Sequence, residues 1–151
     1  MLDKLVKCIS SLDGKPFFSA LTGSNQQEQK VDVTLFQYAL LGLLKSEFEQ
    51  FEWVQEFRPD PARRDKIDIY GKSGDSAIVI ELDKTRADQV SKKFVSRVAL
   101  FPDCDLCYIS LCYPGTERMN LNECLKYFEY CNLLARRMQI SYAGIAMRKK
   151  T

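Results

Sequence analysis

The chain of 151 residues contains no histidine, and this absence excludes several kinds of site. Ser-His-Asp and Cys-His catalysis both need an imidazole, as do zinc sites that combine histidine with cysteine. An excess of one charge is also lacking, because 22 Lys and Arg stand against 20 Asp and Glu and the net charge is +2. The sequence therefore lacks the overall basic character of histones and basic tails, and any surface that binds nucleic acid must be local.

Long hydrophobic segments are missing as well. No apolar run reaches the roughly 18 residues of a membrane span, and Met1 to Ser11 is amphipathic and charged, unlike a signal peptide. We therefore expect a cytoplasmic protein, without membrane contact, whose six cysteines are reduced. Cys104 and Cys107 have a zinc-like spacing, but a strand would send their thiols to opposite faces. We expect them to be core cysteines without a metal.

The length and a hydrophobic content of 46% are those of one ordinary domain with a full core. We divide residues 1–151 into an N-terminal extension over 1–30, a core over 33–113 and a C-terminal helix and strand over 114–151. The polar stretch 22–29 predicts a connection between the body and a lid-like N-terminal piece, which contains a short helix, Leu2–Ser11.

Hydrophobic periodicity then predicts an α/β order of helix, three strands, helix, strand, helix and strand. The predicted helices are Val33–Phe48, a helix opened by a capping box at Thr85–Asp88, and Leu121–Met138. The predicted strands are Phe51–Phe57, Lys66–Tyr70, Ala77–Asp83, Cys104–Tyr113 and Ile140–Met147. Within the first strand, Trp53 and Phe57 are expected on the same core-facing side.

Three carboxylates, Asp68, Glu81 and Asp83, stand at the ends of two very apolar segments. On a strand, Glu81 and Asp83 point to one face while Ile80 and Leu82 point to the other. Carboxylates that approach to about 4 Å repel by about 4 kcal/mol at an effective dielectric of 20, so they need a shared proton, a cation or a metal ion. With oxygen ligands, that metal would be Mg²⁺ or Mn²⁺. The alternative is a structural salt bridge to a nearby basic residue, namely Arg63, Arg64, Lys66 or Lys84.

This order of elements, with an Asp on the second strand and an acidic pair ending the third, resembles the core of the PD-(D/E)xK nuclease superfamily over about residues 33–113. The resemblance implies a restriction-endonuclease-like fold, in which a helix precedes a three-stranded antiparallel meander, a helix and a strand. A helix and a strand at the C-terminus would be additions to that core. It also implies that Asp68 and Glu81 bind Mg²⁺, with Glu47 of the first helix assisting. The backbone carbonyl of Leu82 could hold the same ion together with these two acids.

The sequence departs from this pattern where the family has a lysine, because Asp83 stands two residues after Glu81. Asp83 could act as ligand or base, as the second acid does in restriction enzymes with an E-x-E motif. Alternatively, Lys84 curls in from the strand end or Lys93 reaches in from the following helix, where Gln89 is also a candidate by resemblance. The third interpretation is a site that has lost cleavage.

The expected activity is that of a metal-dependent endodeoxyribonuclease, with DNA as substrate and a homodimer or a partner subunit supplying specificity. Phosphate contacts are predicted for a basic group around the second strand and the following helix: Arg58, Arg63, Arg64, Gln89 and Arg97. Two alternatives stay open. One is a non-catalytic nuclease-fold module in a larger nucleic-acid-processing complex, and the other is an unrelated α/β protein-interaction domain.

Overall fold

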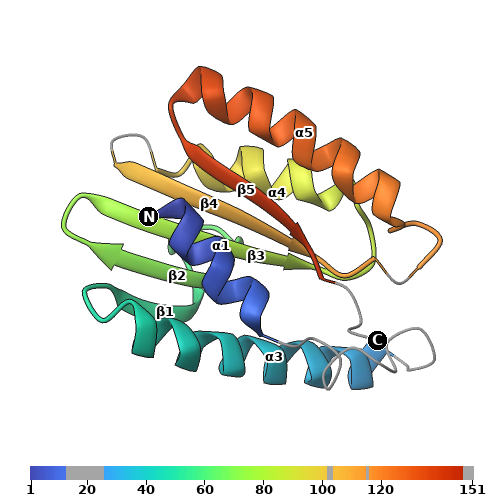
Figure 1. Cartoon of the computed structure of the whole chain (residues 1–151), viewed down its shortest axis with the longest axis horizontal. Helices are drawn as coiled ribbons and strands as arrows, with labels where there is room; N and C mark the ends of the chain where they lie inside the picture. The colour runs from blue at the N-terminus through green and yellow to red at the C-terminus, as the bar shows by residue number, and fades with distance from the viewer. Residues whose placement is uncertain (13–25, 102–103, 115, 148–151) are drawn as a thin grey trace.

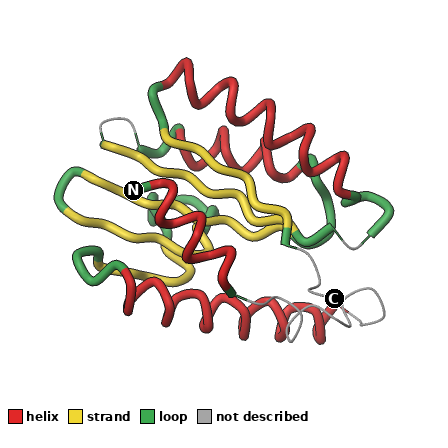
Figure 2. The backbone as a smooth tube through the Cα atoms, in the orientation of Figure 1, coloured by secondary structure: helices red, strands yellow, loops and turns green. Residues whose placement is uncertain are grey.

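The computed structural model of the protein describes residues 1–12, 26–101, 104–114 and 116–147, with the backbone alone for 26–30. A five-stranded mixed sheet forms the middle layer, and helices cover both of its faces (Figures 1 and 2). Helices α1 and α3 lie on one side, and α4 and α5 lie on the other. Residues 22–25 of the predicted polar connection lie outside the described residues.

The elements follow the predicted order. They are α1 (Leu2–Ser11), α3 (Gln26–Glu47), β1 (Glu52–Phe57), β2 (Ile67–Ser73), β3 (Ser76–Asp83), α4 (Gln89–Val98), β4 (Asp105–Cys112), α5 (Leu121–Met138) and β5 (Ser141–Ala146). The strands are ordered β1-β2-β3-β4-β5 in the sheet. The first three form the predicted antiparallel meander, and β4 and β5 run parallel to β3. The α/β class is therefore confirmed.

Two local predictions were wrong. Helix α3 begins at Gln26, so residues 26–29 belong to a helix and not to a connection. The capping box at Thr85–Asp88 does not form, because α4 begins at Gln89 with Asp88, not Thr85, as its N-cap, and the Asp88 side chain makes no cap hydrogen bond. Its carboxylate is instead bound by Arg86, whose Nη2 lies 2.6 Å from Asp88 Oδ2.

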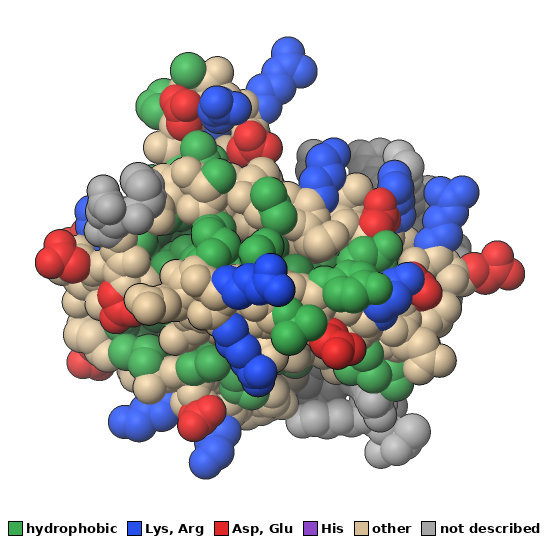
Figure 3. Space-filling view, turned by 90° about the horizontal axis from the view of Figure 1, so that it is seen from above, with side chains coloured by type: hydrophobic (Ala, Val, Ile, Leu, Met, Phe, Trp, Pro, Cys, Tyr) green, Lys and Arg blue, Asp and Glu red, His purple; other side chains and the backbone are tan. Residues whose placement is uncertain are grey.

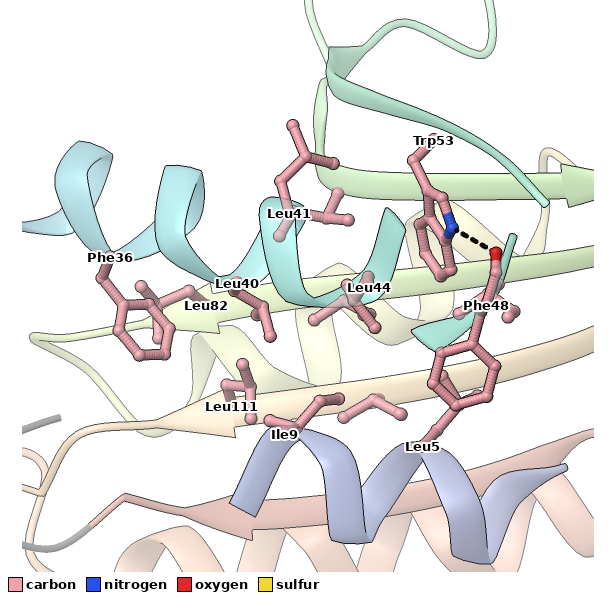
Figure 4. Close-up of a cluster of buried hydrophobic side chains, with 14 of the residues drawn as sticks. Leu5, Ile9, Phe36, Leu40, Leu41, Leu44, Phe48, Trp53, Leu82 and Leu111 are labelled. Carbon is pink, nitrogen blue, oxygen red and sulfur yellow. Dashed lines mark hydrogen bonds between the residues drawn. The ribbon is translucent and has the colours of Figure 1, made fainter. Parts of the chain in front are cut away.

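The sheet has a hydrophobic core on each face. On the α1 and α3 side, Leu5 and Ile9 of α1 are fully buried near Leu111 of β4 and the apolar residues of α3 (Figure 4). Helix α1 is thus part of the core, and the prediction of a separate lid-like piece was wrong. On the other side, Phe94 of α4 packs against Tyr108 of β4, and Val79 of β3 lies in the same core.

Strand β1 does not keep the predicted alternation. Trp53 packs toward α3, where its indole N–H donates to the Phe48 carbonyl at 3.1 Å (Figure 4). Phe57 instead stacks on Tyr70 in the opposite core, with ring centroids 4.2 Å apart. Between them, Glu56 has φ of 55°, which reverses the strand's facing. The prediction that both aromatic residues share one face was therefore wrong.

The structure tests one expectation about the cysteines, that the thiols of Cys104 and Cys107 lie on opposite faces of the sheet. Cys107 belongs to the core beneath α1 and α3, whereas Cys104 packs against the core beneath α4 and α5. Their thiols therefore lie on opposite sides of the sheet, as strand alternation predicts. All six cysteines are free of disulfides, and their metal-free state stays a prediction.

Two glycines provide a test of the packing of α5. At Gly144 of β5 a Cβ atom would collide with the Phe128 ring, whereas at Gly42 of α3 a Cβ would meet nothing within 4 Å. We expect Gly144→Ala to destabilise the protein by about 1–3 kcal/mol through overpacking. Gly42→Ala should stabilise it by about 0.5–1 kcal/mol, because alanine favours a helix interior. Urea unfolding measures the change in the free energy of unfolding for both variants. Equal changes would contradict the close packing of Phe128 against Gly144.

Candidate functional site: an acidic cluster at the end of β3

Asp68, Glu81 and Asp83 meet on the side of the sheet that α4 covers. Glu81 and Asp83 are 1% and 5% exposed and share the strand face of Val79. Asp68 on β2 accepts a hydrogen bond from the Leu82 backbone N–H at 2.7 Å, and its charge is close enough to help raise the pKa of Glu81. The structure therefore places Asp68 and Glu81 side by side on adjacent strands, as predicted, and their sharing of a metal stays a prediction.

Lys93 of α4 points its ammonium group into this cluster. Its Nζ lies 2.8 Å from Asp83 Oδ1 and 3.6 Å from Glu81 Oε2, and it donates to the Leu82 carbonyl at 3.2 Å. The side chain is 22% exposed. Of the alternatives that the sequence left open, the structure thus brings Lys93 to the acids from the helix. Lys84 directly follows the last residue of β3 and is half-buried.

Arg97 lies one turn after Lys93 on the same helix face and is held more tightly. Its Nε donates to Glu81 Oε1 at 2.9 Å, and its Nη1 lies 3.2 Å from Asp65 Oδ1. Its Nη2 donates to the Lys66 carbonyl at 3.0 Å. Arg97 is 9% exposed, so its guanidinium is engaged inside the protein. The prediction that Arg97 contacts DNA phosphates is corrected here, because its donors are already bound by acids and a carbonyl.

The ionisation of the cluster is set by burial and by these ion pairs. Burial, followed by the charge of Asp68, raises the pKa of Glu81 well above its usual range, although Lys93 and Arg97 oppose the change. Burial also raises the pKa of Asp83, against the opposing charge of Lys93. Burial alone would lower the pKa of Lys93, but the carboxylates of Asp83, Glu81 and Asp68 raise it above its ordinary value. Lys93 therefore keeps its positive charge at neutral pH and loses it only at higher pH than an ordinary lysine.

Three buried oxygen atoms in this region have no hydrogen-bond partner among the described residues: Glu81 Oε2, Asp83 Oδ2 and Tyr108 Oη. Unsatisfied buried oxygens are costly, and carboxylate oxygens are ligands that Mg²⁺ prefers. The chemistry of these atoms fits a divalent cation. In the described part of the chain, however, no group of three or more His, Cys, Asp or Glu residues stands as a metal site in its present arrangement. The ammonium group of Lys93 lies among the oxygens instead.

The remaining predicted site residues are dispersed. Glu47 lines an open hollow with Lys4, Lys7 and Cys8, on the side of the sheet that α1 and α3 cover. Because Glu81 faces the other side, the structure does not bring Glu47 to the cluster, and its assignment as a metal-assisting residue is corrected. Gln89 is half-buried in the first turn of α4, one turn before Lys93.

Arg58, Arg63 and Arg64 lie exposed on the loop between β1 and β2. Arg63 pairs with Asp60 at 3.3 Å on the protein surface. Asp65, near the end of the same loop, binds Arg97, so the loop adjoins the acidic cluster. These arginines can approach a ligand at the cluster without losing a buried partner.

Sequence reasoning missed Asp65 and Tyr108. Asp65 precedes the second strand in a run of alternating charges, which carries no sign of an internal partner. Tyr108 is fully buried on β4, and the charges of Glu81 and Asp83 add to the effect of burial in raising the pKa of its hydroxyl. Only the register of β3 against β4 brings this hydroxyl toward the acids.

Comparison with known proteins finds no match to a family model, a curated protein or a solved structure. The helices of the described residues include none that is long and apolar enough to cross a membrane. The interpretation of the site therefore depends on its own geometry.

The buried ion pair between Arg97 and Glu81 gives a direct prediction. Arg97→Met leaves Glu81 without its closest cation, and removing one partner of a buried pair costs about 3–5 kcal/mol. Adding Glu81→Gln to this variant should restore part of the loss, because no buried charge is then left unpaired. Urea unfolding measures the free energy. Arg63→Met is the matched control, because its exposed pair should contribute at most about 1 kcal/mol. Equal losses at Arg63 and Arg97 would contradict this account.

Proposed function

We propose that the protein is a metal-dependent endodeoxyribonuclease that hydrolyses DNA phosphodiester bonds with Mg²⁺ or Mn²⁺. The observation that supports this most strongly is the convergence of Asp68, Glu81, Asp83 and Lys93 at the carboxyl end of β3. The surrounding order of helix, antiparallel meander, helix and parallel strand agrees with the resemblance to the PD-(D/E)xK superfamily.

Each residue of the cluster has a role in this proposal. The carboxylates of Asp68, Glu81 and Asp83, with the Leu82 carbonyl, would hold the metal. A bound Mg²⁺ supplies a water of lowered pKa and positive charge for the phosphate. Lys93 would orient the attacking water or meet charge on the phosphate, which the resemblance assigns to a lysine on the third strand. Arg97 positions Glu81 through the 2.9 Å bond to Oε1, so that Oε2 stays available.

A second candidate is a non-catalytic binding module, and one observation favours it. Glu81 is already paired with both Arg97 and Lys93, so the cluster can be read as a closed set of structural ion pairs. Two unsatisfied carboxylate oxygens in the same cluster argue against this reading, since a purely structural network should satisfy its buried acceptors.

DNA would be held by few contacts. On the side seen in Figure 3, Lys and Arg side chains are interspersed with acidic and apolar ones and do not form a continuous basic surface. The loop with Arg58, Arg63 and Arg64 carries exposed basic side chains and is connected to the cluster through Asp65, which binds Arg97. A second copy or a partner subunit would extend this small surface, and the cytoplasm stays the expected location.

The cleavage experiment uses plasmid, single-stranded and branched DNA with Mg²⁺ or Mn²⁺. Asp68→Ala should abolish cutting. Asp83→Asn keeps the size and removes the charge, and it should lower the rate by about 10²- to 10³-fold, as the loss of a strong electrostatic contribution does. Lys84→Ala should have a much smaller effect. Cleavage that survives Asp83→Asn and disappears with Lys84→Ala would assign the lysine role to Lys84.

DNA binding should be weak and sensitive to salt. Each phosphate that is neutralised contributes a slope of about −0.9 to log affinity against log salt concentration. Replacing Arg58, Arg63 and Arg64 by Gln should make that slope shallower, whereas Lys4→Gln, at an exposed position of α1, should leave it unchanged. Fluorescence anisotropy with labelled DNA measures the slope, and a slope that is independent of the three arginines would remove this surface from the proposal.

A further inference from the structure

The Lys93 ammonium group lies among the same oxygens that the proposed function assigns to the metal. It contacts Asp83 Oδ1, the Leu82 carbonyl and Glu81 Oε2 at 2.8, 3.2 and 3.6 Å. Mg²⁺ needs oxygens at about 2.0–2.1 Å. The ammonium group and a metal ion therefore cannot occupy this position together.

Lys93 and Arg97 differ in how firmly they are held. Arg97 binds Glu81, Asp65 and the Lys66 carbonyl with a planar fork of donors, which fixes the group. Lys93 is a flexible chain whose side chain is 22% exposed, and one of its three contacts, to Glu81 Oε2, is an ion pair too long for a hydrogen bond. Lys93 is thus the cation that can withdraw toward solvent while Arg97 keeps Glu81 in place.

The acidic charges and the unsatisfied oxygen atoms around Lys93 favour the binding of another cation. Asp65, Glu81 and Asp83 form ion pairs with Lys93 and Arg97, and Asp68 lies beside them, so acidic groups outnumber these two cations. Asp83 Oδ2 and the hydroxyl of the fully buried Tyr108 also lack hydrogen-bond partners among the described residues. A divalent cation would offset the excess and bind carboxylate oxygens that are now unsatisfied.

We propose that Lys93 is a built-in competitor of the divalent metal, which enters the cluster only when the lysine side chain leaves it. This inference rests on the proposed function for the identity of the metal and adds its regulation. In the wild-type protein, only molecules in which Lys93 has left the acids can bind the metal. The apparent affinity for the metal is therefore the intrinsic affinity multiplied by the fraction of such molecules. Before metal binding, the Lys93 ammonium group occupies the acidic cluster. After metal binding, it lies outside the cluster, close to the phosphate of the substrate.

The test is a titration of the whole chain with Mn²⁺, in which paramagnetic resonance measures free Mn²⁺. Lys93→Met should bind Mn²⁺ about ten-fold more tightly than the wild type, because the competing conformation is gone. Lys92→Met is the matched control, since Lys92 is exposed on the same helix, and it should bind like the wild type. Affinity that is unchanged or weaker in Lys93→Met, or no Mn²⁺ binding by either protein, would overturn the proposal.

A second measurement uses the wild type alone, in case Lys93→Met does not fold. Acylation of lysine amines by a soluble ester, read by mass spectrometry, should become faster at Lys93 as Mn²⁺ is added and should saturate with the binding curve. The rate at Lys92 should not change. Mn²⁺ binding that leaves Lys93 as slow as before would refute the displacement.

The two proposals fail in different ways. If Lys93→Met gains Mn²⁺ affinity and the wild type cuts no DNA, the competition stands and the nuclease function is wrong. If the wild type cuts DNA and Lys93→Met gains no affinity, the nuclease function stands and the competition is wrong.

Discussion

The buried ion pair between Arg97 and Glu81 is the interaction on which the site depends. Glu81 is 1% exposed, and a carboxylate buried to that extent costs several kcal/mol unless a cation satisfies it. Arg97 does so and at the same time binds Asp65 and the Lys66 carbonyl, just before β2. One side chain thus fixes α4 over the end of β3 and against the start of β2. Lys93, one turn earlier on α4, is placed above Asp83 as a consequence.

The acidic cluster could be predicted because it depends on strand alternation. Glu81 and Asp83 are two residues apart on a regular strand, and the hairpin that joins β2 to β3 sets Asp68 beside them. The choice between Lys84 and Lys93 could not be made in this way. It depends on the rotation of α4 about its axis, which its packing against the sheet determines. The same packing of α4 holds Arg97 inside the protein and leaves Lys93 partly exposed.

Other predictions failed where tertiary structure overrides a local pattern. Glu47 has a position on α3 that suits the family pattern, but α3 covers the opposite face of the sheet. Phe57 leaves the face of Trp53 because Glu56 adopts a positive φ, which no sequence signal announces. Asp88 has the spacing of a capping residue, yet the guanidinium of Arg86 is a stronger partner than a backbone N–H. Each failure involves a competing contact or backbone conformation that local sequence does not encode.

In the proposal, the Lys93 ammonium group and a divalent metal ion compete for the acidic cluster. A crystal structure of the protein grown with Mn²⁺, with anomalous diffraction data, tests this most directly. We expect an anomalous peak bound by Asp68, Glu81, Asp83 and the Leu82 carbonyl, with the Lys93 ammonium group withdrawn and the bond between Arg97 and Glu81 intact. Mn²⁺ bound elsewhere, with Lys93 still in contact with Asp83, would contradict it.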